Sequence, residues 1–157
     1  QASVASEGLP AYDREMLSRE MALFPDWLLD RHLGLALDEA EHAMLAETFA
    51  LLTDNALAQP QVCVHRDYHS RNLMVVDGLN PGIIDFQDAV AGPVSYDLVS
   101  LLRDCYIAWP DDLVQSLTAH YLKLAGEAGL LGEAQRRQFP GWFDLMGIQR
   151  HLKAAGI

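Results

Sequence analysis

The sequence predicts an α+β domain that is mostly helical and carries a small β-meander. Apolar residues recur at helical spacing through most of the chain, whereas short β-branched runs are confined to its middle third. Half of the 157 residues are hydrophobic and 21% are charged, which is ordinary for a folded soluble protein. This length is sufficient for one domain with a substantial hydrophobic core.

The predicted helices have recognisable start and stop signals. Asp13 is expected to cap the first helix, and Asp38 with Glu41 three positions later is typical of a capping box. Pro25 and Pro140 are expected to interrupt helices, because proline lacks the backbone N–H that a helix interior requires. The predicted helices span residues 13–23, 27–33, 38–57, 96–108, 111–126, 133–138 and 142–155.

Three short apolar runs in the middle of the chain predict strands at residues 62–64, 73–76 and 83–84. Asp67 follows the first run, Asp85 ends the third, and Asn72 lies five positions after Asp67. An Asp-Gly pair between the second and third runs predicts a turn. We therefore predict a meander that holds Asp67, Asn72 and Asp85 near one another, followed by a Gly/Pro-containing loop at residues 89–94.

Two carboxylates and a carboxamide in one place form a set of hard oxygen ligands, which suits Mg²⁺ with its waters and a substrate's phosphates. The spacing His65-x-Asp67-x-x-x-x-Asn72, with Asp85 after a downstream strand, also fits the catalytic loop of kinases. In kinases the first Asp accepts the proton of a substrate hydroxyl, and the Asn and the second Asp hold metal ions beside the nucleotide phosphates. The simpler alternative is turn chemistry, because Asp and Asn favour loops.

A downstream segment at residues 92–98, Gly-Pro-Val-Ser-Tyr-Asp-Leu, completes a family pattern. With the catalytic-loop spacing and the Ile-Ile-Asp-Phe run, it resembles the C-terminal lobe of the aminoglycoside phosphotransferase and choline kinase-like superfamily, which has a protein-kinase-like fold. The chain departs from protein kinases after the Asp-Phe pair, where Gln87 stands in place of the usual Gly. Within the superfamily, the chain most resembles bacterial kinases of the anomeric hydroxyl of amino sugars, N-acetylmuramate and N-acetylglucosamine, through residues 12–27, 65–75, 83–104 and 144–155.

The resemblance implies a phosphotransferase that uses ATP and Mg²⁺ to phosphorylate a small-molecule hydroxyl in cell-wall recycling. Asp67 would be the catalytic base, and Asn72 and Asp85 would bind Mg²⁺. His65 and Asp97 would support the catalytic loop through hydrogen bonds to backbone groups. The residues expected to contact the acceptor are His69, Asp88, Asp144, Gln149 and Arg150.

Two alternatives stay open on the sequence. The acceptor could be an aminoglycoside or another small molecule, and a cationic aminoglycoside suits the chain's net charge of −11. N-acetylmuramate carries a carboxylate, for which Arg103 and Arg150 are candidate partners. The chain could instead be a non-catalytic, kinase-like binding module, although such a module has no physical need for all three oxygen-bearing side chains.

A kinase of this type also has an N-terminal lobe with a nucleotide-covering loop and a β-strand Lys. Neither is present before Val62, and the two Lys residues, Lys123 and Lys153, lie late in predicted helices. We therefore expect residues 11–157 to be a C-terminal lobe whose N-lobe and C-terminal end are missing, with residues 1–10 as a linker or hinge remnant. The expected partners are the acceptor, the nucleotide and the missing lobe.

The strongly acidic balance argues against a nucleic-acid or anionic-membrane surface, because both require basic patches. No apolar stretch has the length of a transmembrane span, and no signal peptide is visible. Cys63 and Cys105 show no metal-ligand spacing and are expected to be buried thiols in a reducing compartment. The expected location is therefore the cytoplasm.

Overall fold

The computed structural model describes residues 1, 3–78 and 80–157, and it confirms a mostly helical α+β fold with short strands. The helical elements are α1 (Arg14–Leu23), the π-helical η1 (Phe24–His32), α2 (Glu39–Leu57), the 3₁₀ turn η2 (Ser70–Asn72), α3 (Tyr96–Leu102), α4 (Asp111–Glu127) and α5 (Glu133–Ala155). The strands are β1 (Gln61–Val64), β2 (Leu73–Met74), β3 (Gly82–Ile83) and β4 (Val90–Pro93).

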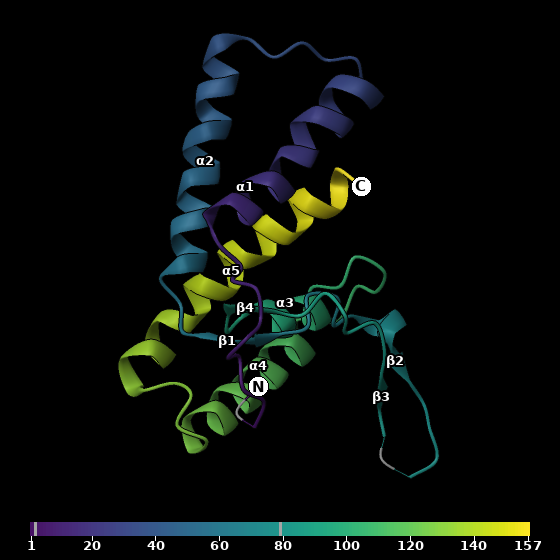
Figure 1. Ribbon diagram of the computed structural model, residues 1–157, viewed down its shortest axis with the longest axis vertical. Helices are drawn as coiled ribbons and strands as arrows, with labels where there is room; N and C mark the ends of the chain where they lie inside the picture. The colour runs from purple at the N-terminus through teal and green to yellow at the C-terminus, as the bar shows by residue number, and fades with distance from the viewer. Residues whose placement is uncertain (2, 79) are drawn as a thin grey trace.

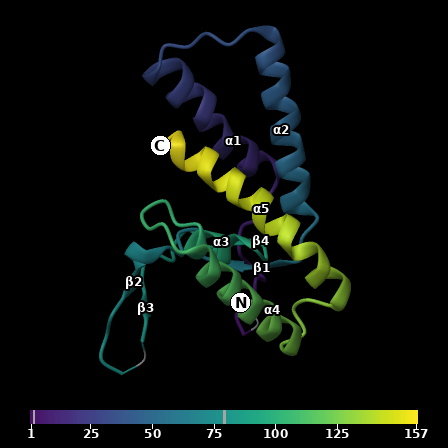
Figure 2. The same ribbon diagram turned by 180° about the vertical axis from the view of Figure 1, so that it is seen from behind.

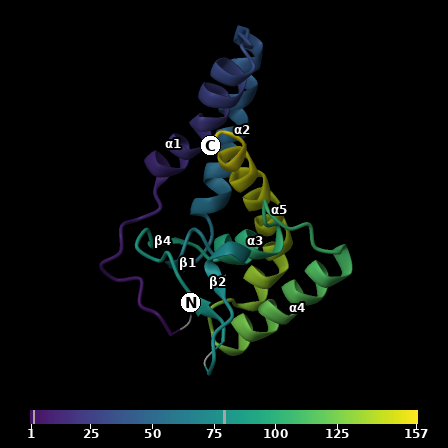
Figure 3. The same cartoon turned by 90° about the vertical axis from the view of Figure 1, so that its right-hand side faces the viewer.

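Helices α1, α2 and α5 pack against one another at one end of the molecule (Figure 1). The β2–β3 hairpin extends away from the body in both face-on views (Figures 1 and 2). Seen from the side, α4 lies at the same end as this hairpin, and α5 runs between the two ends (Figure 3). The fully buried side chains of the core come from several of these elements and include Leu17, Met21, Val64, Tyr96, Phe139 and Met146.

Both predicted helix caps are confirmed. Asp13 accepts a hydrogen bond from the backbone N–H of Met16 at 2.9 Å. Asp38 and Glu41 form a reciprocal capping box, with bonds of 2.8 and 2.9 Å between each side chain and the other residue's N–H. These bonds satisfy N–H groups that have no partner inside the helix, so the beginnings of α1 and α2 are determined locally.

The two predicted interruptions of helices by proline are wrong. Pro25 lies in the first turn of η1, where a missing N–H costs little, and the chain runs from α1 into η1 without a break. Pro140 lies inside α5, which continues unbroken from Glu133 to Ala155. It is exposed, while its neighbours Phe139 and Trp142 are buried, so burial of the apolar face holds the helix together.

Helix α3 ends at Leu102, whereas the sequence predicts an end near residue 108. The Asp104 carboxylate accepts the N–H of Tyr106 at 2.8 Å, and the Trp109 indole donates to the Leu101 carbonyl at 3.0 Å. These side-chain bonds offer the backbone an alternative to further helical turns. The chain between α3 and α4 is consequently a loop, and Cys105 within it is exposed rather than buried as predicted.

The strand pairing differs from the predicted meander. Strand β1 pairs antiparallel with β4, in the segment predicted as a loop, and β2 pairs antiparallel with β3. Gly92 permits this pairing, because a Cβ there would lie 3.2 Å from the Cβ of Tyr12 and 3.3 Å from a methyl of Val64. The backbone of residues 10–12 then adds to the outer edge of β4 through two bonds of 2.8 Å with Ala91.

None of the described helices is long and apolar enough to cross a membrane.

Candidate active site

The predicted catalytic loop, residues 65–72, directly follows β1, and Asp85 lies just after the end of β3. The Asn72 side-chain amide donates to the backbone carbonyl of Asp67 at 2.9 Å and contacts the Asp85 carboxylate at 3.4 Å. Asn72 therefore lies between the other two residues and holds the loop in a closed turn. The structure brings together all three residues that the spacing singled out.

Two further bonds hold Ile84, at the end of β3, against the loop: one to His65 after β1 and one to Asn72 before β2, although β1 and β3 belong to different sheets. The His65 ring Nε2 lies 3.0 Å from the carbonyl of Ile84, and the N–H of Ile84 donates to the carbonyl of Asn72 at 3.2 Å. Because Ile84 directly precedes Asp85, these bonds place the second carboxylate beside the loop. The sequence predicts this proximity, but through a continuous sheet that does not form.

Asp97, in the first turn of α3, braces the start of the loop. Its carboxylate accepts the N–H of His65 at 2.9 Å and the N–H of Arg66 at 3.2 Å. Burial raises the pKa of Asp97, and the two N–H bonds oppose that shift without reversing it. These are the backbone contacts that the family resemblance implies for Asp97.

Two residues of the site have left-handed backbone conformations, with φ of 74° at Arg66 and 67° at Asp85. Such conformations are uncommon outside glycine, and each costs on the order of 1 kcal/mol or more. Each of these residues adjoins or belongs to the oxygen-bearing set, because Arg66 directly precedes Asp67. The surrounding hydrogen bonds must therefore hold the backbone in place at both positions.

The segment around Asp85, residues 83–88, is exposed to solvent. Asp85 is exposed, and one of its carboxylate oxygens accepts a bond from the Gln87 side chain at 2.7 Å. Large apolar side chains around it are also exposed, namely Met74, Val75, Ile83, Ile84 and Phe86. An apolar rim beside exposed carboxylates is typical of a ligand or partner surface.

Asp104 is a further supporting residue, which lies within the predicted helix 96–108 and which no sequence motif singled out. It is partly buried, and it accepts the N–H of Ser70 at 2.9 Å in addition to the N–H of Tyr106. Burial alone would raise the pKa of Asp104, but its hydrogen bonds with Ser70 and Tyr106 outweigh burial and lower it. Asp104 and Ser70 are 34 positions apart, so no local pattern could reveal this bond.

The predicted acceptor contacts are scattered. His69 lies in the loop, with its ring 5.3 Å from that of Tyr106. Asp144 is exposed on α5 and forms an ion pair with Arg103. Asp88 is exposed beside the loop, and its backbone carbonyl accepts a bond from Arg66 at 3.4 Å.

The two other residues predicted to contact the acceptor, Gln149 and Arg150, lie on α5. Gln149 is fully buried and donates to the hydroxyl of Tyr12 at 3.1 Å. Arg150 donates to the backbone carbonyl of Arg66 at 2.9 Å, and its guanidinium lies 4.6 Å from the centre of the Tyr96 ring. Both side chains thus bond to other groups of the protein, Gln149 to Tyr12 and Arg150 to the backbone of Arg66.

A cavity of about 610 Å³ adjoins the catalytic loop and helices α3 and α4. Its walls include His65, Tyr68 and Asp97 together with many apolar side chains, but none of the three oxygen-bearing residues. Within the described part of the chain, no cluster of three His, Cys, Asp or Glu side chains is arranged to hold a metal ion. Any metal held here would depend on Asn72 and Asp85 together with ligands from a substrate.

Comparison with known proteins identifies relatives of the chain. Relatives from Neisseria meningitidis serogroup B, Pseudomonas putida and Pseudomonas aeruginosa are each 48% identical to the chain over 149 residues. Each carries the name N-acetylmuramate/N-acetylglucosamine kinase. The aligned region covers 95% of this chain but 44% of each relative, so the chain spans less than half the length of these relatives.

A model of the phosphotransferase enzyme family matches residues 1–137 of the chain. This match includes the whole catalytic loop and the Asp97 brace, and it confirms the resemblance that the motif spacing indicated. The chain belongs to the phosphotransferase enzyme family.

Proposed function

We propose that this chain is the catalytic-loop lobe of an ATP-dependent kinase that phosphorylates the anomeric hydroxyl of an amino sugar. The observation that carries the proposal is the contact of Asn72 with both Asp67 and Asp85. It supports separate roles for neighbouring side chains, with Asp67 as the proton acceptor and Asn72 and Asp85 as the metal ligands. Phosphoryl transfer depends on such positioning and on charge neutralisation.

Asn72 and Asp85 fit a magnesium ion by the chemistry of their donors. Mg²⁺ prefers oxygen ligands and is usually held by one or two carboxylates together with water and substrate phosphates. The exposed Asp85 carboxylate leaves room for those additional ligands. When bound, the ion would neutralise negative charge on the nucleotide phosphates.

Asp67 would orient the acceptor hydroxyl and accept its proton. Its own backbone carbonyl is bonded to the Asn72 amide at 2.9 Å and to the N–H of His69 at 3.0 Å. These bonds fix the peptide that carries the carboxylate, which reduces the freedom lost when the acceptor binds. A positioned general base of this kind contributes about 10²- to 10⁴-fold in rate.

The proposed acceptor follows the names of the relatives, N-acetylmuramate and N-acetylglucosamine. Of the two arginines considered for the carboxylate of N-acetylmuramate, Arg150 is bonded to the backbone behind the loop. The Arg103 side chain is 40% exposed and pairs with the exposed Asp144. Arg103 is therefore the more accessible of the two candidates.

The nucleotide would lie between this lobe and an N-terminal lobe, against the exposed apolar rim beside Asp85. The extent of the relatives beyond the aligned region supports the existence of such a lobe. A cytoplasmic location, with ATP and amino sugars released from the cell wall, belongs to the same proposal. An aminoglycoside remains the competing acceptor because of the acidic charge of the chain.

The test is a product assay on the full-length gene product with ATP, Mg²⁺ and a panel of amino sugars and aminoglycosides. We expect Mg²⁺-dependent formation of a sugar 1-phosphate. Asp85→Ala should abolish Mg²⁺-dependent nucleotide binding, measured by calorimetric titration, while the exposed control Asp30→Asn should bind normally. Transfer to aminoglycosides alone would overturn the assigned acceptor, and absence of any transfer would favour a non-catalytic binding module.

A further inference from the structure

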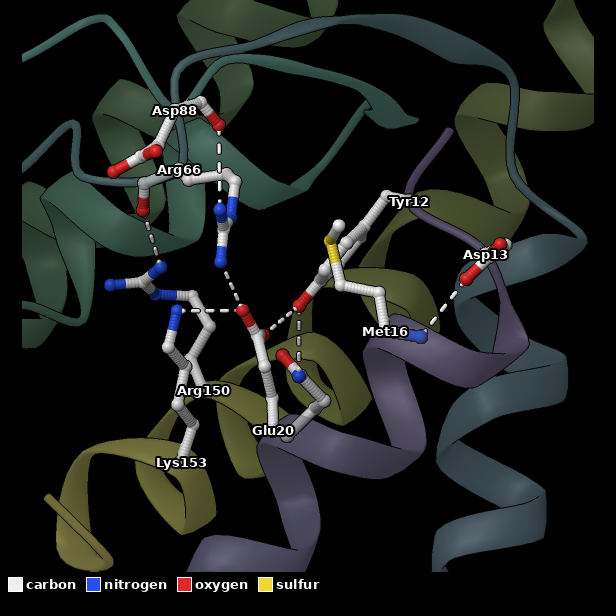
Figure 4. A network of polar contacts seen from close by, with 9 residues as sticks. Tyr12, Asp13, Met16, Glu20, Arg66, Asp88, Arg150 and Lys153 are labelled. Atoms are coloured by element: carbon white, nitrogen blue, oxygen red, sulfur yellow. Dashed lines mark hydrogen bonds and ion pairs between the residues drawn. The ribbon is translucent and has the colours of Figure 1, made fainter. Parts of the chain in front are cut away.

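A buried carboxylate outside the oxygen-bearing set connects three distant parts of the chain. Glu20 on α1 is 7% exposed. Its Oε1 accepts from the guanidinium of Arg66 and from the Lys153 ammonium, the latter at 3.0 Å, and its Oε2 accepts from the Tyr12 hydroxyl (Figure 4). Burying a charge is costly unless it is paired and hydrogen-bonded, and here both carboxylate oxygens are engaged.

Arg66 is the member of this group that belongs to the catalytic loop. Its N–H donates to Asp97 at 3.2 Å, and its carbonyl accepts from Arg150 at 2.9 Å. Its guanidinium bonds to Glu20 and to the backbone carbonyl of Asp88 at 3.4 Å. Backbone and side chain of this one residue are thus held by four partners from four segments of the chain, of which Figure 4 shows Glu20, Asp88 and Arg150.

This concentration of contacts coincides with the left-handed backbone of Arg66, at φ of 74°. A non-glycine residue retains such a conformation only when its surroundings determine it. The next residue is Asp67, and the direction of its side chain depends on the preceding peptide. A change of about 1 Å in the position of a reacting group can cost on the order of 100-fold in rate.

We infer that Glu20 is a positioning residue for the catalytic loop: its carboxylate holds Arg66 in the left-handed conformation that aims Asp67 at the acceptor. The inference rests on the proposed function for its kinetic consequence. Glu20 itself touches neither substrate nor metal ligand, and it acts through Arg66. The lowered pKa of Glu20, which Lys153, Tyr12 and Arg66 produce against the opposing effect of burial, keeps the carboxylate charged for this contact.

A merely structural role is the competing explanation, because Glu20 also ties α1 to Lys153 on α5. The chain offers a control in a second ion pair of α1, which lies at the surface. Arg14 on α1 pairs with Asp54 on α2, at 2.6 Å, and this pair has no connection to the catalytic loop. Loss of the Arg14–Asp54 pair removes a tether of α1 without disturbing Arg66.

The test uses the full-length protein with Glu20→Gln, Arg66→Met, the double variant and the control Asp54→Asn. Positioning predicts that Glu20→Gln lowers kcat by about 10- to 100-fold with little change in acceptor KM. The double variant should be no more than about threefold slower than the slower single variant, because both act through one contact. Asp54→Asn should keep kcat within about twofold.

Hydrogen exchange provides a readout that needs no substrate. In Glu20→Gln, but not in Asp54→Asn, amides of residues 62–72 should exchange at least about tenfold faster. Unchanged kcat in Glu20→Gln with active wild type, or multiplicative losses in the double variant, would overturn the inference. An inactive wild type would overturn the proposed function instead, and the exchange at residues 62–72 would then decide the inference alone.

Discussion

Two ends of the molecule are held together by different interactions. One end is formed by α1, α2 and α5, and the other by the catalytic loop and the β2–β3 hairpin. At the helical end, Leu17, Met21 and Met146 are fully buried. At the other end, Val75 and Phe86 are 92% and 68% exposed, and the backbone is held in left-handed conformations. Packing stabilises the first region, whereas hydrogen bonds to the backbone position the second.

This difference predicts that substitutions in the two regions affect different quantities. Substitutions at the loop should lower kcat and leave the free energy of unfolding nearly unchanged. Substitutions in the buried core should lower the free energy of unfolding and leave kcat nearly unchanged. The Glu20–Arg66 contact joins the two regions, so it is where both quantities should change together. The expected effects below run from the largest to the smallest.

The largest effect is expected from Asp67→Asn at the loop. The amide keeps the size of the carboxylate but cannot act as the proton acceptor, so kcat should fall by about 10²- to 10⁴-fold. The melting temperature should stay close to that of the wild type, because Asp67 is partly exposed. Steady-state kinetics and thermal unfolding check this prediction, and normal turnover in the variant would exclude Asp67 as the base.

The next effect is expected from Phe139→Ala in the core. The Phe139 ring is fully buried and lies 5.6 Å from the ring of Tyr121 and 6.3 Å from that of Phe143. Its removal should lower the free energy of unfolding by about 3–5 kcal/mol. Denaturant unfolding measures the loss. A large fall in kcat at temperatures where the variant is folded would contradict the separation of the two regions.

A smaller effect is expected from Asp97→Asn, which tests the backbone brace. Asparagine has one carbonyl oxygen in place of two carboxylate oxygens, so one of the bonds to His65 and Arg66 is lost. We expect kcat to fall by about tenfold. Burial raises the pKa of Asp97, so the neutral side chain also avoids a desolvation cost and stability should change little. Unchanged kcat would show that the brace is dispensable.

The smallest effect is a pH dependence of stability from Glu20. Its pKa in the folded protein is lowered, so the charged carboxylate stabilises the fold above the ordinary glutamate value of about 4.3. This contribution declines as the pH falls below that value towards the folded pKa. Asp97 has the opposite sign, since its raised pKa makes protonation favour the folded state.

Comparing thermal unfolding of the wild type with Glu20→Gln between pH 7 and pH 3 isolates the Glu20 contribution, because Asp97 is common to both. The difference in melting temperature should narrow as the pH falls. A difference that stays constant across this range would show that Glu20 is not ionised in the folded protein.

Local sequence signals predicted the elements whose causes are local. The Asp13 cap and the Asp38–Glu41 capping box occur as predicted, because a side chain satisfies an N–H three residues away. The prediction at Pro25 failed because proline costs little in the first turn of a helix. The prediction at Pro140 failed because burial of the apolar face of α5 outweighs the local cost of proline. Residues 90–93 were predicted as loop because their Gly/Pro content hides a strand that exists only through its pairing with β1.

The sequence by itself determined which residues are the candidates for the chemistry, because Asp67, Asn72 and Asp85 belong to one short segment with a characteristic spacing. The tertiary structure alone decided what holds that segment. Glu20, Asp97, Asp104 and Arg150 contact the catalytic loop from positions 31 to 84 residues away along the chain. Such contacts leave no local signal, because their geometry arises only when helices distant in sequence pack together.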